Sequence, residues 1–296
     1  SLKDESGSLV GVAVGFRERS PRKLVGPLTS RVWLGALPSI VSGVENGLLD
    51  FLSNLELYAR DSGNSILEVQ SAASRGGREE LEQLEFQLTR RLEFVLDLQL
   101  SEEELWKGMN YKRRKNINKA RRMDVTVSDL SGAEGIAALR RLQGDSSKRI
   151  VARGGPDITR KHELSEDPVG VLLDAGVGRI VVAKLEGQIV SASLFTFFNG
   201  TVYHTLSGHS NDGTKAQAPT LLLWETMLKY RDLGATSFNF GGCSASAVDK
   251  ESPEYGVYDY KRAFGGECIE CTSGRKVLRK VRHAALRTLK RVAGNK

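Results

Sequence analysis

The spacing of apolar residues in the first third of the chain predicts a short run of strands around one helix. Residues 9–17 and 31–37 are rich in β-branched side chains and are interrupted by glycine, which is typical of strands. Leucines between residues 46 and 60 are too dense for a strand and favour a helix. Residues 66–70 then form a further predicted strand, so the segment has the order β–β–α–β.

The later part of the chain repeats this pattern with clearer boundaries. Residues 178–184, 188–198 and 201–206 are three apolar, β-branched segments joined by the short turns Glu186-Gly187 and Asn199-Gly200. Asn-Gly is a strong hairpin signal because both residues accept the positive φ of a type I′ turn. These segments therefore predict an antiparallel meander.

Helix boundaries are marked at two places in this later part. Ser101 followed by Glu104 is a capping-box sequence, and it predicts the start of a helix that continues through a basic segment to Ala120. Pro219 at a first turn and Gly234 after a last turn enclose a segment that is apolar nearly all round. We expect this second helix to be buried on several sides.

The repeated order of strands and helices predicts the fold class and its division. Two similar lobes of the α/β (α+β) class, with mixed and mostly antiparallel sheets flanked by helices, satisfy the pattern. We expect the first lobe over residues 1–90 and the second over residues 91–273. Residues 274–296 are predicted to form a basic amphipathic helix.

Composition excludes several classes of protein. The chain has 296 residues, of which 40% are hydrophobic and 27% are charged, so it is neither collagen-like nor disordered throughout. No run of about 18 apolar residues predicts a membrane-spanning helix. Three cysteines are too few for a disulfide framework and offer no four-ligand zinc site, so we expect no metal. No secretory leader is visible, which favours a cytoplasmic location.

The net charge of +7 is concentrated in two segments. Residues 275–296 hold nine basic and no acidic residues, and residues 112–122 hold seven basic and no acidic residues. Such segments suit a phosphate-rich partner or the inner face of an anionic membrane, whereas the alternative is a solvated helix face. For the tail, we favour docking of its apolar stripe on the second lobe with an exposed basic rim.

Several segments of the chain follow one another in the order known from one protein family. They are Phe94-Val-Leu-Asp-Leu98 with Glu104-Leu-Trp106, residues 112–120, residues 218–225, Phe238-Asn-Phe-Gly-Gly242 and residues 255–267. Together they resemble the FemAB-like branch of the GNAT acyltransferase superfamily, which includes peptidoglycan-bridge aminoacyltransferases and BioF2-like acetyltransferases. The likeness extends from about Leu34 onward, and Asn239 stands where that family commonly has Asp.

This resemblance implies two tandem GNAT-like lobes and an acyltransferase activity. Its characterised members move an amino acid from aminoacyl-tRNA to an amine of a peptidoglycan precursor, without a bound cofactor. Residues 207–219 lack the glycine-rich element that binds pyrophosphate in coenzyme A-dependent relatives, which favours a tRNA-borne donor. The alternatives are an acyl-coenzyme A donor with a polysaccharide precursor as acceptor, and a non-catalytic module that binds tRNA or a membrane surface.

The resemblance also implies where the chemistry takes place. Lys261 is the candidate for stabilising the oxyanion, and Tyr260 is expected to handle the acyl group or a phosphate in a groove shared by the two lobes. Asp259 either accepts the amine proton or forms an ion pair with Lys261 or Arg262, and we favour the ion pair.

Further residues are assigned to substrate binding because they are basic or lie in the matching segments. Glu225 points either into a cleft or out to solvent, and the sequence does not decide between them. His204 is a strand histidine, for which we favour a structural role over that of a base. The predicted substrate-binding residues are Lys112, Arg113, Arg114, Asn116, Lys119, Lys215, Trp224, Glu225, Asn239, Gly241, Gly242 and Tyr258.

Overall fold

The computed structural model describes residues 1–4, 6–20, 26–152, 154, 157, 168–285 and 288. The chain divides into two compact units. The first consists of Ser1–Leu92 together with Ile269–Lys296, and the second is Glu93–Cys268. Two long strands, β7 (Gln87–Asp97) and β13 (Glu267–Val277), carry the chain from one unit to the other.

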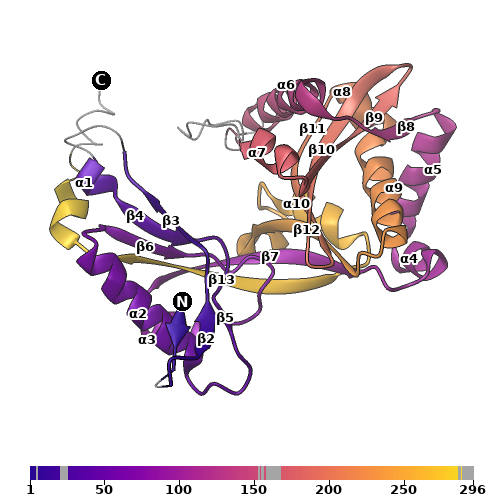
Figure 1. The fold of residues 1–296 in the computed structure, drawn as a ribbon. Helices are drawn as coiled ribbons and strands as arrows, with labels where there is room; N and C mark the ends of the chain where they lie inside the picture. The colour runs from indigo at the N-terminus through magenta and orange to yellow at the C-terminus, as the bar shows by residue number, and fades with distance from the viewer. Residues whose placement is uncertain are drawn as a thin grey trace. The chain divides into compact units, whose positions relative to one another are not determined.

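The first unit contains strands of two sheets, helices α1 to α3 and the helical residues 280–285 (Figure 1). Its larger sheet has the order β3-β4-β6-β13, in which β4 and β6 are parallel and the other two pairs are antiparallel. A small sheet has the order β1-β2-β5. The bounds are β1 Leu2–Lys3, β2 Leu9–Val12, β3 Gly15–Glu18, α1 Gly26–Thr29, β4 Arg31–Leu34, β5 Ser39–Ile40, α2 Gly47–Asp61, β6 Ile66–Val69 and α3 Arg78–Gln83.

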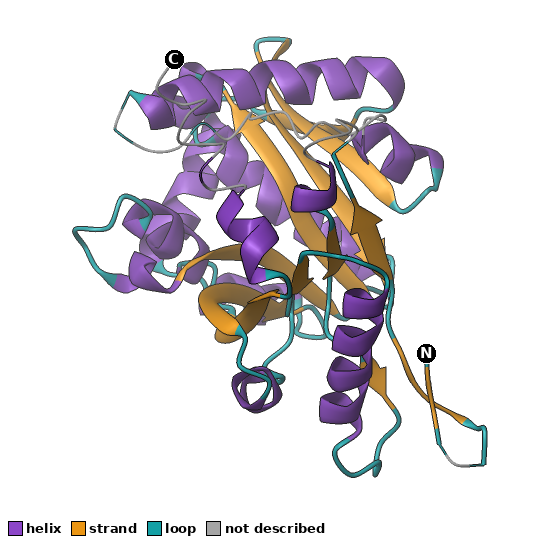
Figure 2. Ribbon diagram, turned by 90° about the vertical axis from the view of Figure 1, so that its left-hand side faces the viewer, coloured by secondary structure: helices purple, strands orange, loops and turns teal. Residues whose placement is uncertain are grey.

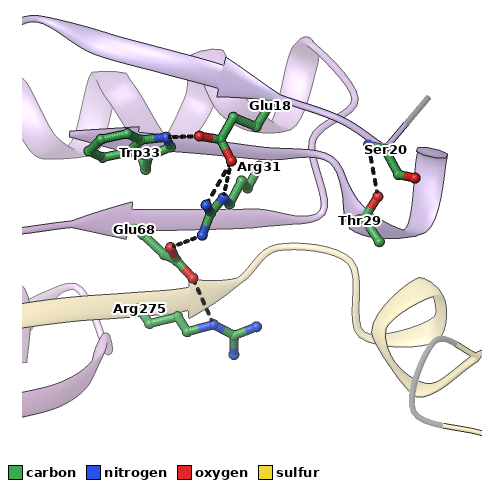
Figure 3. Close-up of polar contacts among 7 residues, drawn as sticks. All are labelled: Glu18, Ser20, Thr29, Arg31, Trp33, Glu68 and Arg275. Atoms are coloured by element: carbon green, nitrogen blue, oxygen red, sulfur yellow. Dashed lines mark hydrogen bonds and ion pairs between the residues drawn. The ribbon is translucent and has the colours of Figure 1, made fainter. Parts of the chain in front are cut away.

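An ion-pair ladder crosses four strands of the first unit's larger sheet (Figure 3). Arg31 of β4 contacts Glu18 of β3 at 2.7 Å and Glu68 of β6 at 2.8 Å, and Arg275 of β13 contacts Glu68 at 3.1 Å. The Trp33 indole also donates to Glu18. These side chains are partly exposed, so the ladder fixes strand neighbours more than it adds stability.

The predicted C-terminal helix begins later than expected. Residues 274–277 end strand β13, where Gly274 to Val277 pair antiparallel with β6, and residues 280–285 are helical. Most of the predicted helix beyond residue 285 lies outside the described residues. The prediction for 274–277 was wrong because the basic residues there suggested a helix, whereas the sheet pairing decides the structure.

Two basic residues of the tail have a structural use within the first unit. Arg279 donates to the carbonyl of Arg60, and Arg282 donates to the carbonyl of Gly63. Arg60 lies in the last turn of α2 and Gly63 follows two residues after the helix ends, in the region where the negative end of the helix dipole favours a nearby positive charge. These two guanidinium groups therefore act as caps of α2.

The second unit is a mixed sheet flanked by helices (Figures 1 and 2). From β7 its strand order is β7-β12-β11-β10-β9-β8. The bounds are α4 Glu102–Gly108, α5 Tyr111–Arg122, β8 Thr126–Asp129, α6 Gly132–Val151, α7 Pro168–Asp174, β9 Gly178–Leu185, β10 Gln188–Phe198, β11 Thr201–His209, α8 Asn211–Ala216, α9 Ala218–Asp232, β12 Ser237–Ser244, a 3-10 turn Ala245–Val248 and α10 Tyr255–Arg262.

The predicted meander of β9, β10 and β11 is confirmed. Both strand pairs are antiparallel, and β10 has the predicted bounds. Asn199 and Gly200 have φ values of 46° and 76°, so both take the positive φ that a type I′ turn requires. Glu186 and Gly187 have φ values of 50° and 77° and make a second turn of this kind.

Helices cover both faces of this meander. Leu139 and Leu142 of α6 belong to one apolar cluster with Leu194 of β10. Phe197, which alternation places on the opposite face of β10, has its ring 5.9 Å from that of Tyr230 in α9. Helix α9 is buried over most of its surface, as predicted. The mixed α/β class predicted from the sequence is confirmed.

Two local predictions are corrected by the structure. The helix expected to run on from Ser101 breaks after its capping box, because Asn110 accepts from the Arg113 N–H and caps a second helix, α5. Residues 207–219, expected as a loop, contain the end of β11 and helix α8.

No helix in the described part of the chain has the length and hydrophobicity needed to cross a membrane.

Candidate functional site

A cavity of about 370 Å³ lies within the second unit, on the α9 face of the sheet. A β-bulge positions its side chains. Phe195 pairs with His204 but Leu194 pairs with Leu206, so Thr205 is the extra residue of β11. This shift in alternation lets His204, Ser207 and His209 face the same cavity.

The cavity lies where two parallel strands stop pairing. β11 and β12 pair from Thr201 to Tyr203 with Ser237 to Asn239. The next residue of each strand, His204 and Phe240, lines the cavity. The first turn of α9 contributes Pro219 and Thr220, and α10 contributes Tyr260 and Lys261.

Lys261 is held at the cavity by a chain of hydrogen bonds that starts in the core. Asn239, which is 2% exposed, donates to Glu93 at 2.9 Å and accepts from the Gly241 N–H at 2.7 Å. Gly241 has φ of 70°, a conformation that glycine adopts without strain. The Gly242 carbonyl then accepts from Lys261 Nζ at 3.0 Å. The predicted site residues Asn239, Gly241, Gly242 and Lys261 are thus brought together.

Tyr260 and Arg113 form the second part of the site. The Arg113 guanidinium lies over the Tyr260 ring, with 4.2 Å between Cζ and the ring centroid. The Tyr260 hydroxyl donates to Thr220 Oγ1 at 3.5 Å. Burial raises the pKa of Tyr260 above its ordinary value, and burial lowers the pKa of Arg113. Tyr260 therefore stays a neutral phenol at physiological pH, and Arg113 stays a cation.

Two neutral histidines line the same cavity. Burial, and secondarily the charge of Lys261, lowers the pKa of His204 to about 3. Burial lowers the pKa of His209 to about 4, with Arg149 adding to the shift. His204 Nε2 is 3.2 Å from Ser193 Oγ, and its ring stacks on Phe195 at 5.2 Å. Neither ring carries charge at neutral pH.

The described lining of the cavity therefore carries two cations and no carboxylate. Such a lining attracts a negative group and disfavours an ammonium ion, so an amine substrate is driven toward its neutral, nucleophilic form. It also places fixed positive charge where an oxyanion develops during acyl transfer. Among the described residues, no group of three or more metal-ligating side chains gathers.

Asp259 and Tyr258, which precede Tyr260 and Lys261 in α10, do not line this cavity. Asp259 forms an ion pair with Arg262 at 3.3 Å, the arrangement that the sequence favoured over a base. Tyr258 packs edge-on against Phe94, with ring centroids 5.6 Å apart. Their place in α10 explains this, since neighbouring residues of a helix face different directions.

Helix α5 brings only one of its predicted binding residues to the cavity. Arg113 lines it, whereas Lys112 and Lys119 are exposed and Asn116 is half-buried. Arg114 instead donates to the carbonyls of Trp106, Lys107 and Met109, which caps the end of α4. Arg114 therefore has a structural use.

Three further predicted binding residues lie away from the cavity lining. Lys215 is exposed and pairs with Asp212 at 3.6 Å. Trp224 is 1% exposed and packs against another tryptophan, so it belongs to the core. Glu225 forms an ion pair with Arg121 at 2.8 Å. Its carboxylate therefore points toward the surface, which decides between the two orientations that the sequence left open.

Several residues that line the cavity were not predicted from the sequence. His204 bonds Ser193 and stacks on Phe195, as a satisfied strand histidine does, but its place beside Lys261 was not predicted. His209, Ser193, Ser207 and Thr220 were not assigned to the site. Alternation along β10 and β11 was the available signal. The bulge at Thr205 reverses that alternation, and no residue pattern marks it.

A family model for the acetyltransferase (GNAT) domain matches residues 110–262, about half of the chain. The chain therefore belongs to the GNAT family and carries an acyltransferase domain, as the sequence predicted. Every residue that lines the cavity falls within the matched range.

Particular relatives support the FemAB-like branch of this family. A lipid II:glycine glycyltransferase of Staphylococcus epidermidis is 32% identical over 143 residues, covering 48% of this chain and 32% of the relative. One of Staphylococcus aureus is 35% identical over 81 residues, covering 27% of this chain and 19% of the relative. The chain thus spans about a third or less of these relatives' length.

Solved structures share the fold at low sequence identity. The crystal structure of FemX has a TM-score of 0.70 and 15% identity, covering 94% of this chain and 87% of that one. The structure of L-PGS from Bacillus licheniformis has a TM-score of 0.57 and 14% identity, covering 100% and 89%. These likenesses establish the fold.

Proposed function

We propose that this chain transfers an aminoacyl group from aminoacyl-tRNA to an amine of a peptidoglycan precursor, with no resident cofactor. The observation that carries the proposal is the cavity in which Lys261 and Arg113 stand beside two neutral histidines with no carboxylate in the described lining. The glycyltransferase relatives, whose name specifies lipid II, support the acceptor class.

In this reaction Lys261 stabilises negative charge on the carbonyl oxygen. The acceptor nitrogen attacks the ester carbon, a C–N bond forms, and the C–O bond to the ribose of the tRNA breaks. The amine proton leaves with the departing ribose oxygen, directly or through water. Lys261 Nζ, held by the Gly242 carbonyl, is fixed before the substrate arrives, which is the condition for effective electrostatic stabilisation.

The charge of α5 supports a donor that carries phosphates. Lys112 and Lys119 of this helix are exposed, outside the cavity lining. A tRNA acceptor end could follow these lysines toward the cavity. Such contacts make binding sensitive to salt, since each phosphate contact releases counterions.

The test is incubation with a mixture of charged tRNAs and a set of lipid-linked and nucleotide-linked peptidoglycan precursors, followed by mass spectrometry of the acceptor. The proposal expects a mass increase of one amino-acid residue that disappears when the tRNA is deacylated beforehand. An unchanged acceptor, with tRNA binding retained, would support the non-catalytic alternative instead.

An acyl-coenzyme A donor is the second candidate, because the matching family model describes acetyltransferases and the first turn of α9 opens at the cavity. A helix N-terminus favours pyrophosphate. Titration calorimetry with coenzyme A separates the two donors. Saturable binding, together with an acetyl or longer acyl increment on the acceptor, would favour this second candidate.

A further inference from the structure

Arg113 is a buried cation that stands at the cavity without an anionic partner. It is 5% exposed, and its guanidinium forms no hydrogen bond with any residue that the structure describes. Its Nε in particular is buried and has no partner. Burying a charge without a partner is costly, so a cation kept in this state indicates that its partner is a ligand.

Two aromatic rings pack against the Arg113 guanidinium, and its N–H edge remains available to a ligand in the cavity. Its Cζ lies 4.2 Å from the Tyr260 ring centroid and 5.4 Å from that of Phe264. Asn110 fixes the start of the helix by accepting from the Arg113 N–H at 2.9 Å. A guanidinium stacked on an aromatic ring still offers its planar donors to a carboxylate or a phosphoryl group.

The nearby acidic residue does not neutralise Arg113. The negative charge of Asp259 acts on Arg113 through space, but its carboxylate is within ion-pair distance of Arg262, at 3.3 Å, and does not line the cavity. The other charged group in the described lining is Lys261, which is also a cation. The two cations therefore favour a ligand that carries an anionic group.

We infer that Arg113 binds an anionic oxyacid group, a carboxylate or a phosphoryl group, carried by the acyl acceptor. This inference rests on the proposed function. The reacting end of an aminoacyl ester is neutral at the ester and positive at its ammonium group, so the donor's reacting end brings no anion to this cavity. The acceptor is thus an amine whose anionic group fits the cavity together with the nucleophilic nitrogen.

The first test compares stability without ligand. Breaking a buried ion pair strongly lowers stability, whereas replacing a buried cation that has no anionic partner with an apolar side chain removes a desolvation cost and loses only its contact with the rings. We expect Arg113→Met to unfold at the same urea concentration as the parent chain or a higher one. Lys115→Gln, which removes an exposed cation from the same helix, α5, is the matched control and should leave the midpoint unchanged. A lower midpoint for Arg113→Met would overturn the inference.

The second test observes anion binding directly. In protein labelled with ¹⁵N-arginine, the Nε–H signal of Arg113 is assigned by its loss in Arg113→Lys and is followed during titration with sodium acetate or sodium phosphate. Sodium chloride at equal ionic strength is the control. A saturable shift with acetate assigns a carboxylate, and one with phosphate alone assigns a phosphoryl group. No saturable shift, or the same shift with chloride, would overturn the inference.

The transfer assay separates this inference from the proposed function. Arg113→Gln should raise the KM for the acceptor about tenfold or more and leave the KM for the donor nearly unchanged, whereas the control Lys115→Gln should leave the KM for the acceptor unchanged. Equal effects on both KM values would overturn the inference while transfer itself stands. A saturable anion shift in a chain that transfers nothing would keep the anion site and remove the proposed function.

Discussion

Replacing Asn239 with Leu should weaken the second unit and displace Lys261 at the same time. Asn239 is 2% exposed, and it bonds Glu93 at 2.9 Å and the Gly241 N–H at 2.7 Å. Leu has a similar size but neither hydrogen bond. Loss of a buried partner costs about 1–3 kcal/mol for each group left behind. We therefore expect the free energy of unfolding to fall by about 2–5 kcal/mol.

Urea unfolding followed by tryptophan fluorescence measures this loss of stability in the unit that contains Asn239. Trp106 and Trp224 belong to the second unit and contact each other, with ring centroids 5.3 Å apart. Asn118→Leu, at an exposed position of α5, is the control and should change stability by less than about 0.5 kcal/mol. A loss below about 1 kcal/mol for Asn239→Leu would refute the reasoning.

Asn239→Asp separates the hydrogen bonds from the charge. It places a second carboxylate beside Glu93, and like charges raise the pKa of the pair in the folded state. The folded variant then holds a proton that the unfolded chain releases above about pH 4. Its stability relative to the parent chain should decrease as pH rises from about 5 to 8. A difference from the parent that does not vary with pH would contradict this account of the pair.

Two further predictions concern the strand that carries the bulge. Folding lowers the pKa of His204 from 6.5 to about 3, so the folded state binds fewer protons than the unfolded chain. The contribution of neutral His204 to stability is therefore complete above pH 6.5 and is lost as pH falls toward 3. His204→Gln should flatten the acid side of the stability profile measured by urea unfolding, and an unchanged profile would contradict the assignment. Gly208→Ala should destabilise by about 3 kcal/mol or more, because its Cβ would overlap the backbone N of Gln143. The control is Gly144→Ala, in the same helix as Gln143, where the added Cβ would have no neighbouring atom within 4 Å. This variant should instead stabilise the protein by about 0.5–1 kcal/mol. Equal effects of the two substitutions would refute the packing argument.

The elements that sequence predicted well are those decided by neighbouring residues. The Asn199-Gly200 turn, the capping box at Ser101 and the enclosed helix after Pro219 depend on backbone preferences within a few positions. The break at Asn110 was missed although Gly108 and Asn110 are poor helix formers, because apolar residues at helical spacing continue on both sides of them. The hydrogen bond from the Arg113 N–H to the Asn110 side chain, which caps a new helix, decides the outcome.

The site was predictable only in part, for a related reason. Lys261, Tyr260 and Arg113 lie in segments that resemble a known family, and the structure places all three at one cavity. The sequence expected a groove shared by two lobes, whereas the lining of this cavity belongs entirely to the second unit. The bulge at Thr205 depends on pairing between strands, which no local pattern records.

Charge runs proved the least informative signal. Of the basic segment around α5, Arg113 enters the cavity and Arg114 caps α4, while Arg121 pairs with Glu225 at the surface. The same formal charge thus has three different uses within one helix. Only the burial and the partners of each side chain distinguish them.

Single-turnover transfer by Lys261→Met tests the central claim most directly. If the Lys261 ammonium stabilises the oxyanion, the rate of the chemical step should fall by about 10²–10³ while the affinities for donor and acceptor change little. Lys250→Met, at an exposed position of the same unit, should keep the parent rate. A Lys261→Met rate within about twofold of the parent, or a loss found only in substrate affinity, would contradict the account.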